Sequence, residues 1–360
     1  MTIRRPVLPA SEAHRPVTMK DVAAAAGVAQ STVSRILNDA PSGISVSEET
    51  RQRVLAMASE LGYRPHPFAR ALRGAPSMLL GAVVRDITDP FFALAVEALS
   101  IEAKERGYSV VLGHAAAKAD EALALTAVLE ARHCDAIVLL GDFRGERRLV
   151  EDLRSSEVRV VGLWHGLERG RPFPTVGVDN RAGIRAALDH LVGYGHRRIA
   201  YVGEAVGDMH ERHVAYREYA DAAGLVAPRG YTRLVENTTT GGGLALAALL
   251  KQRSRPTAIL AGTDTLAMGV IHAAYESGVS VPGELSVVGF DDIPLASATV
   301  PSLTTVKMPI AEIVAAGVAL AVGEGRWSAQ DGEAAPRTVF QPTLIVRGST
   351  APLAATADAS

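Results

Sequence analysis

The chain has 360 residues, of which 48% are hydrophobic and 21% are charged. This length favours two or three domains with at least one large core, and the composition excludes a wholly disordered, collagen-like or low-complexity protein. The single cysteine, Cys134, excludes an internal disulfide bond and a cysteine-based zinc site. We expect a cytoplasmic protein, because no apolar run reaches the length of about 18 residues that a membrane helix needs, and residues 1–15 lack the apolar core of a signal peptide.

The net charge of −2 hides an asymmetry between two parts of the chain. Residues 1–74 carry ten Arg or Lys and six Asp or Glu, a net charge of +4, whereas the remaining residues carry 27 and 33, a net charge of −6. A basic segment suggests a polyanionic partner such as nucleic acid, although a solvated basic face is the commoner explanation. Charge alone leaves both interpretations open.

Three short helices are predicted over residues 17–62, after a proline-containing segment, residues 1–16, that is expected to be a disordered tail. Thr18 is placed to cap a first helix over residues 19–26, and Gly27 permits a sharp turn into a second helix over residues 30–38. Ser47 is placed to cap a third helix that ends near residue 61. The apolar spacing predicts a small core made of Val22, Ala23, Ala26, Val33, Ile36, Leu37, Val54, Leu55, Ala58 and Leu61.

The second helix carries a short hydrogen-bonding face, with Gln30, Ser31, Ser34 and Arg35 on the side away from the core. In a helix-turn-helix of this spacing, the second helix enters the major groove of DNA, where such side chains meet base edges and phosphates. The alternative is an ordinary three-helix packing domain. Residues 63–76 then read as a linker with one helix that is too short to be stable without a partner.

From residue 79 onward, apolar strands alternate with amphipathic helices. The strands that we expect include residues 79–84, 109–112, 136–140, 158–163, 175–178, 199–202, 258–260 and 285–289. Apolar strands joined by crossover helices predict parallel sheets, and about ten strands are too many for one such sheet. The predicted fold is therefore α/β, with two doubly wound lobes and a ligand cleft at the carboxyl ends of the strands.

Several separated blocks of the chain resemble the lactose-repressor (LacI/GalR) family, beginning with Asp21-Val22-Ala23, Gly27 and Thr32-Val33-Ser34-Arg35 in the helix-turn-helix. Further matching blocks are residues 46–51, 61–65, 69–73, 86–92, 178–180, 195–200, 287–292 and 301–306. The resemblance covers nearly the whole chain. It implies a helix-turn-helix headpiece over residues 17–62 and a hinge helix over 63–76. It also implies two periplasmic-binding-protein-like lobes, formed by residues 77–177 plus 308–335 and by 178–307 plus 336–349, with a disordered tail over 350–360.

Carried over by position, Gln30 and Ser31 resemble the variable base-reading pair of the family. The other expected DNA contacts are Thr18, Thr32, Ser34, Arg35, Asn38, Tyr63, His66 and Leu72. The resemblance implies that Leu72 is a wedge between base steps in the minor groove. Ala29 stands where serine is frequent in the family, so the second helix lacks a side-chain cap, and His66 stands where asparagine is frequent.

For the ligand cleft, the resemblance points to residues from both lobes: Asp86, Phe91, Phe92, Trp164, Arg212, Asp264 and Asp291. Carboxylates and an arginine beside aromatic rings suit a polyhydroxylated ligand such as a sugar. Each residue also has a structural alternative, since Phe91 and Phe92 suit a core and Asp264 suits a helix cap. Thr263 stands where asparagine is common, so the ligand is expected to differ from those of the best-known sugar repressors.

No catalytic motif is present: the sequence contains neither G-x-S-x-G nor H-E-x-x-H, and His210 and His213 have no evident third metal ligand. We therefore expect no catalysis, cofactor or metal. The resemblance implies a homodimer or a tetramer on a near-palindromic operator, and the lack of leucine heptads after Arg347 favours the dimer. The alternatives are a sugar-binding receptor without a DNA role, a regulator that responds to a nucleobase or nucleoside, and an α/β enzyme.

Overall fold

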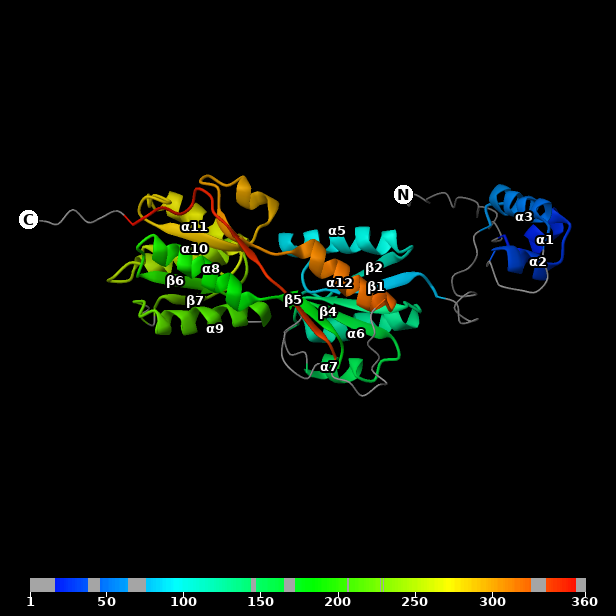
Figure 1. The fold of residues 1–360 in the computed structure, drawn as a ribbon, viewed down its shortest axis with the longest axis horizontal. Helices are drawn as coiled ribbons and strands as arrows, with labels where there is room; N and C mark the ends of the chain where they lie inside the picture. The colour runs from blue at the N-terminus through cyan, green and yellow to red at the C-terminus, as the bar shows by residue number, and fades with distance from the viewer. Residues whose placement is uncertain are drawn as a thin grey trace, which may run out of the picture. The chain divides into compact units, whose positions relative to one another are not determined.

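The computed structural model describes residues 17–37, 46–63, 76–143, 147–164, 172–205, 207–226, 228, 230–324 and 335–353. The chain divides into two compact units, a headpiece up to Ser77 and a body from Met78 onward (Figure 1). In the described part of the chain, none of the helices combines the length and the apolar character that a bilayer crossing requires.

The described residues of the headpiece form three helices, as predicted. They are α1 (Met19–Ala26), α2 (Gln30–Leu37) and α3 (Glu48–Glu60). Gly27 ends α1 with a φ of 65°, a left-handed conformation that favours glycine. The Asp21 carboxylate accepts hydrogen bonds from the backbone N–H and the hydroxyl of Thr18, at 2.7 and 2.6 Å, which caps the start of α1. At the start of α3, the Ser47 hydroxyl accepts from the backbone N–H of Thr50.

The buried face of α3 is narrower than predicted. Val54 and Ala58 are buried, but Leu55 and Leu61 are 46% and 38% exposed, so their assignment to the core is wrong. Successive residues of a helix point about 100° apart, and Leu55 therefore turns outward when Val54 faces the core. The Arg53 Nε donates to the backbone carbonyl of Ala26 at 3.1 Å and ties α3 to the end of α1.

The first lobe of the body contains a six-stranded parallel sheet in the order β11-β5-β4-β3-β1-β2. Its strands are β1 (Leu79–Val84), β2 (Ser109–His114), β3 (Ala136–Leu140), β4 (Arg159–Leu163), β5 (Thr175–Val178) and β11 (Arg337–Phe340). Its helices are α5 (Pro90–Glu105), α6 (Ala119–Ala131), α7 (Arg147–Leu153) and α12 (Ile310–Val322). Helices α5 and α12 pack together on the sheet, and α6 packs with α7 (Figure 1).

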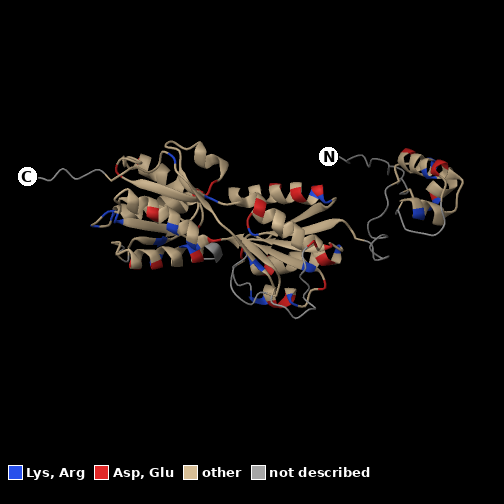
Figure 2. Ribbon diagram, in the orientation of Figure 1, with Lys and Arg blue, Asp and Glu red and all other residues tan. Residues whose placement is uncertain are grey.

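The second lobe contains a six-stranded sheet in the order β12-β10-β9-β8-β6-β7, in which only the pairing of β12 with β10 is antiparallel. The strands are β6 (Ile199–Gly203), β7 (Thr232–Leu234), β8 (Ala258–Ala261), β9 (Ser286–Asp291), β10 (Thr304–Lys307) and β12 (Thr343–Ile345). The helices are α8 (Asn180–Gly193), α9 (Gly207–Ala222), α10 (Thr239–Leu250), α11 (Asp264–Glu276) and the 3-10 helix η1 (Pro294–Ser297). Figure 2 shows the charged residues mostly on helices and loops, as expected for strands that lie between layers of helices.

The chain passes between the lobes at three places: after β5, between β10 and α12, and between β11 and β12. Two expected boundaries differ from this structure. Strand β11 extends the sheet of the first lobe, although residues 336–349 were expected in the second lobe. Residues 350–353 are not part of a tail, because Thr350 is buried and the backbone N–H of Leu353 donates to the carbonyl of Tyr194 at 2.8 Å.

A buried histidine connects this C-terminal segment to the second lobe. His196 Nδ1 lies 3.0 Å from the Thr257 hydroxyl, and its Nε2 lies 3.1 Å from both the Ser286 hydroxyl and the Ala351 carbonyl. The ring is only 2% exposed, and burial lowers the pKa of His196 because it disfavours the charged imidazolium. Burial therefore favours the neutral form of this histidine in the folded protein.

The lowered pKa predicts a loss of stability in mild acid. The stability that depends on neutral His196 is complete above the pKa of a free histidine, about 6.5, and is lost as the pH falls below it, by at most about 1.4 kcal/mol per pH unit. Urea unfolding at several pH values measures this slope. The slope should become shallower in His196→Gln and remain in the surface variant His272→Gln; equal slopes in all three proteins would contradict the prediction.

Candidate functional site

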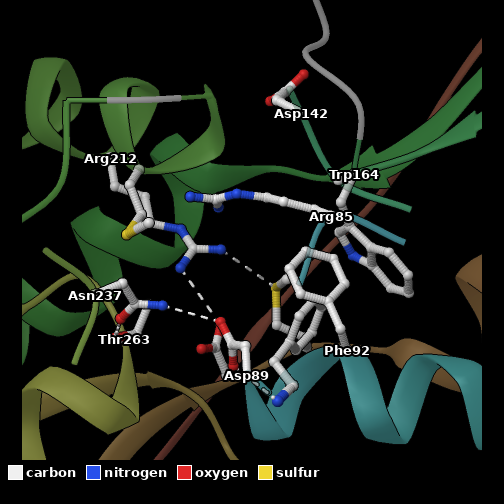
Figure 3. Close-up of a pocket in the computed structure, with 13 residues that line it drawn as sticks. Arg85, Asp89, Phe92, Asp142, Trp164, Arg212, Asn237 and Thr263 are labelled. Carbon is white, nitrogen blue, oxygen red and sulfur yellow. Dashed lines mark hydrogen bonds and ion pairs between the residues drawn. The ribbon is translucent and has the colours of Figure 1, made fainter. Parts of the chain in front are cut away.

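A narrow cleft lies between the lobes, at the carboxyl ends of their strands (Figure 3). Helix α5 and the ends of β1, β3 and β4 contribute from the first lobe, and α9 and the end of β9 contribute from the second. The side chains leave only about 40 Å³ for the centres of water molecules. The lining residues are Arg85, Asp89, Phe91, Phe92, Gly141, Asp142, Trp164, Met209, Arg212, Asn237, Thr263, Asp291 and Met308.

Three aromatic side chains form the wall of the first lobe. The ring of Phe91 meets that of Trp164 edge to face at 5.0 Å and that of Phe92 at 5.2 Å. Trp164 directly follows β4 and has a φ of 50°, a left-handed conformation that is rare for a bulky residue. Its indole Nε1 is buried without a hydrogen-bond partner among the described residues. A flat apolar wall with one donor suits a ligand that has C–H faces and oxygen acceptors.

Arg212 forms the centre of the second lobe's side of the cleft. Its Nε donates to Asn180 Oδ1 at 2.9 Å, and its Nη1 donates to the Gly262 carbonyl at 2.6 Å and to Asp291 Oδ1 at 3.3 Å. The guanidinium carbon also lies 3.7 Å from the centre of the Phe290 ring. Because both side chains of the ion pair are nearly inaccessible to solvent, Arg212 and Asp291 are fixed in place before any ligand arrives.

Burial raises the pKa values of two carboxyl groups at the cleft. Burial raises the pKa of Asp291 well above its usual value, and the attraction of Arg212 opposes this shift without cancelling it. Burial also raises the pKa of Asp89, although the backbone N–H of Phe91 donates to this carboxylate and favours its charged form. These carboxyl groups accept hydrogen bonds in a site that water reaches poorly, where such bonds are strong.

Polar side chains of the two lobes meet directly across the cleft. Arg85 Nη2 donates to Glu204 Oε2 at 2.8 Å, and Asn237 Nδ2 donates to Asp89 Oδ2 at 2.9 Å. The Thr263 hydroxyl donates to Asn237 Oδ1 at 2.6 Å and so orients its amide. Figure 3 shows Arg85 extending across the cleft and Asn237 facing Asp89.

Five of the seven residues expected in the cleft line it: Phe91, Phe92, Trp164, Arg212 and Asp291. Asp86 does not, because its half-exposed carboxylate accepts hydrogen bonds from the N–H and hydroxyl of Thr88 outside the cleft. Asp264 is fully buried, and it accepts from the Thr305 hydroxyl of β10 and from the Ile293 N–H in the loop after β9, so it connects α11 to both. Burial raises the pKa of Asp264 to about 7.

The sequence predictions missed several polar residues of the cleft. Arg85 is the first residue after β1, and Asp89 caps α5 directly before Pro90. Both lie within or beside the matching block at residues 86–92, so the rule that ligands meet the carboxyl ends of parallel strands could have found them. No local signal marks Asn237 or Glu204, whose places depend on the packing of the second lobe.

The headpiece presents most of its expected DNA contacts on or near α2. Gln30 and Ser31 are exposed, and Thr32, Ser34 and Arg35 are partly exposed. Two residues have structural partners instead: the Thr18 hydroxyl donates to Asp21, and Tyr63 packs against the headpiece core. The remaining expected contacts, Asn38, His66 and Leu72, lie outside the described residues.

Known proteins match most of the chain. Residues 18–66 match the model of bacterial regulatory proteins of the lacI family, and residues 188–350 match the periplasmic binding protein-like domain. The chain is 32% identical to the HTH-type transcriptional regulator GalS of Salmonella typhimurium, over 93% of this chain and 97% of that protein. It is also 32% identical to catabolite control protein A of Priestia megaterium, over 84% and 91% of the two chains.

Solved structures agree with these sequence matches. The lac repressor dimer bound to operator and the anti-inducer ONPF superimposes with a TM-score of 0.83 and 26% identity, over 94% of this chain and 100% of that one. The complex of the transcriptional regulator CelR with cellobiose gives a TM-score of 0.65 and 28% identity, over 93% and 100%. A helix-turn-helix headpiece on a two-lobed binding-protein body defines a DNA-binding transcriptional regulator, not an enzyme. The chain belongs to the LacI family.

Proposed function

We propose that this regulator represses carbohydrate-metabolism genes, binds a near-palindromic operator as a dimer, and changes its operator affinity when a sugar or sugar derivative enters the cleft. The observation that carries the ligand half is the cleft itself, where an aromatic wall faces a fixed Arg212–Asp291 pair. A pyranose offers C–H faces to such a wall and hydroxyls to such polar groups. Because the partner is DNA, the regulator is expected to work in the cytoplasm.

The DNA half of the proposal rests on α2. Its exposed residues Gln30 and Ser31 would read base edges in the major groove, where an amide side chain pairs with adenine through two hydrogen bonds. Thr32, Ser34 and Arg35 would contact bases or phosphates on either side. Outside the described residues, Asn38 and His66 would contact the DNA backbone, and Leu72 would insert between base steps of the minor groove.

The dimer half of the proposal is supported by apolar side chains on the first lobe. Ile101 of α5 and Val111 and Leu112 of the edge strand β2 are exposed, as is Ile87 just before α5. We infer that a second copy of the chain covers these side chains, because contiguous exposed apolar patches mark protein–protein interfaces. The related lac repressor is a dimer on its operator, and a dimer of this chain would bring two headpieces to the half-sites of one operator.

A related regulator supports a sugar as the ligand of the cleft, and one other class of ligand is a candidate. The related regulator CelR forms a complex with cellobiose. A nucleobase would also stack on Phe91 or Trp164, which keeps a nucleobase or nucleoside as the second candidate ligand. A measurement of operator affinity distinguishes sugars from nucleobases and nucleosides, because only one of these two classes of ligand should change that affinity.

A shift assay at controlled salt tests the proposal, with DNA from upstream of the protein's own gene and a panel of sugars, sugar phosphates and nucleosides. The proposal is supported if the protein binds this DNA specifically and one compound of the panel changes the affinity. Gln30→Ala should relax discrimination at one symmetric base position by about 1–3 kcal/mol, because an amide contact to that base is lost. The control is Glu276→Ala, at an exposed position of α11 in the second lobe.

Two outcomes would contradict these expectations. Equal weakening of all DNA sequences by Gln30→Ala would mark this residue as a phosphate contact. If no natural promoter fragment is preferred over bulk competitor DNA, with or without the panel, the proposed repressor function is wrong.

A further inference from the structure

Two polar bridges join the lobes across the cleft. One is the ion pair between Arg85, at the end of β1, and Glu204, just after β6; their side chains are 13% and 8% exposed. The other is the hydrogen bond from Asn237, which lies between β7 and α10, to Asp89 at the start of α5. Each bridge has one partner in each lobe, so any motion that separates the lobes at the cleft must lengthen both.

The space between these bridges is too small for a sugar. A single buried water molecule needs about 10–15 Å³ of space for its centre, and the cleft offers about 40 Å³ in this measure. A few water molecules therefore fit, whereas a sugar ring is several times larger than one of them. A ligand of that size can enter only if the lobes move apart or the bridging side chains leave their partners.

We propose that Glu204 and Asn237 act as built-in competitors of the ligand. Glu204 supplies to Arg85 the acceptor oxygen that a ligand would supply, and Asn237 supplies to Asp89 the donor that a ligand hydroxyl would supply. The inference rests on the proposed function for its view of the cleft as the ligand site. It makes Arg85 and Asp89 specificity-determining residues, since a ligand that breaks both bridges must replace both bonds.

Two unused donors support this exchange. The Arg85 Nε and the Trp164 Nε1 are both buried without a partner among the described residues, and both side chains line the cleft. A buried donor without an acceptor is unfavourable, so each one favours a ligand that carries oxygen acceptors toward the first lobe. Such a ligand would accept hydrogen bonds from these two donors in addition to replacing Glu204 as the acceptor of Arg85 Nη2.

The bridges also hold the empty cleft closed. A buried charged pair is costly to break when no replacement is present, because the separated charges stay poorly hydrated. Without ligand, the population of proteins with separated lobes should therefore be small. Removing the negative charge of Glu204 or the amide of Asn237 should increase that population.

Acrylamide quenching of Trp164 fluorescence measures this opening without any ligand or DNA. The chain has two tryptophans, so Trp327→Phe serves as the background for every protein. Trp164 is 3% exposed and should be quenched weakly in this background. Glu204→Gln combined with Asn237→Ser should raise the quenching constant about twofold or more, with each single variant in between, because the open state gains population.

A matched control separates opening from a general loss of charge. Glu324→Gln removes an ion pair of similar length, Arg106 to Glu324 at 3.0 Å, that lies within the first lobe. It should leave the quenching of Trp164 unchanged. Spin labels on one exposed residue of each lobe, Asp120 and Asp221, then test whether the lobes separate; the labelled chains are diluted with unlabelled protein so that distances within one chain are measured.

The expected result is a longer inter-lobe distance in the double variant and an unchanged distance in Glu324→Gln. If the folded double variant keeps both the quenching constant and the inter-lobe distance of the background protein, the bridges do not hold the cleft closed and the inference is wrong. If quenching rises without a change in distance, the side chains have loosened locally, which also overturns it. Neither outcome bears on operator binding, so the proposed function stands or falls separately in the shift assay.

Discussion

Arg212→Met is expected to abolish the response to the effector and to lower the free energy of unfolding of the body by about 3–5 kcal/mol. Arg212 is the only described partner of Asp291 in an ion pair, and it also donates to the carbonyl of Gly262 and to Asn180 Oδ1. Methionine fills similar space but leaves a buried carboxylate and two buried acceptors without their donor. Urea unfolding of the whole chain and the shift assay with the active member of the panel measure the two effects.

Two further variants show whether the effect comes from the buried charge. Arg181→Met removes an arginine of the same lobe that pairs with Glu218 on the surface, and it should change stability little because both partners are exposed. Asp291→Asn combined with Arg212→Met should cost less than the sum of the single variants, since the unpaired charge is then absent. Additive costs would show that Asp291 and Arg212 do not act as a pair.

Val54→Asp is expected to remove specific operator binding entirely while leaving the Tm of the body unchanged. Val54 has no exposed surface and packs in the headpiece core with Val22 and Val33. A domain of three short helices has a small free energy of unfolding. Burying a carboxylate without a partner costs more than this free energy, so the headpiece should unfold. The shift assay measures the loss, and calorimetry follows the two units, which are compact separately.

The neighbouring residue provides the control for this experiment. Leu55→Asp introduces the same side chain one position later, on the exposed side of α3, and should leave the headpiece folded. It should retain at least part of the operator affinity, since only an added surface charge opposes the DNA. If Val54→Asp binds operator as well as Leu55→Asp does, the headpiece core is not what holds α2 in its place.

The sequence predicted most of the fold because its signals are local. Caps, turn glycines and apolar spacing mark the helices of the headpiece, and long apolar runs mark the buried parallel strands. The short edge strands were harder to predict: β7, β11 and β12 have three or four residues each, too few to show a period. Leu55 and Leu61 were misassigned because apolar residues of a helix can be exposed, and only the packing of α1 and α2 decides which face of α3 is covered.

Residues of the candidate site were predictable where a local sequence pattern marks the element that carries them. Phe91 and Phe92 follow the strand end in a recognisable block, and Arg212 and Asp291 lie in their own blocks or helices. The cross-lobe partners were not predictable, because Arg85 and Glu204 are 119 residues apart in the chain, and Asp89 and Asn237 are 148 apart. Such pairs depend on how the two lobes pack against one another, and the local spacing of residues in the sequence does not indicate this packing.

The last strand of the first lobe has a consequence for how the protein is made. Strand β11 comes from residues 337–340, near the end of the chain, yet it pairs with β5 at the edge of a sheet whose other strands are complete by residue 178. A ribosome that builds the chain from its N-terminus delivers this strand only after nearly the whole second lobe has emerged. During translation, β5 is therefore an unpaired edge strand of the first lobe until β11 emerges. Chaperone binding at that edge would matter more than for a protein whose domains follow one another in sequence.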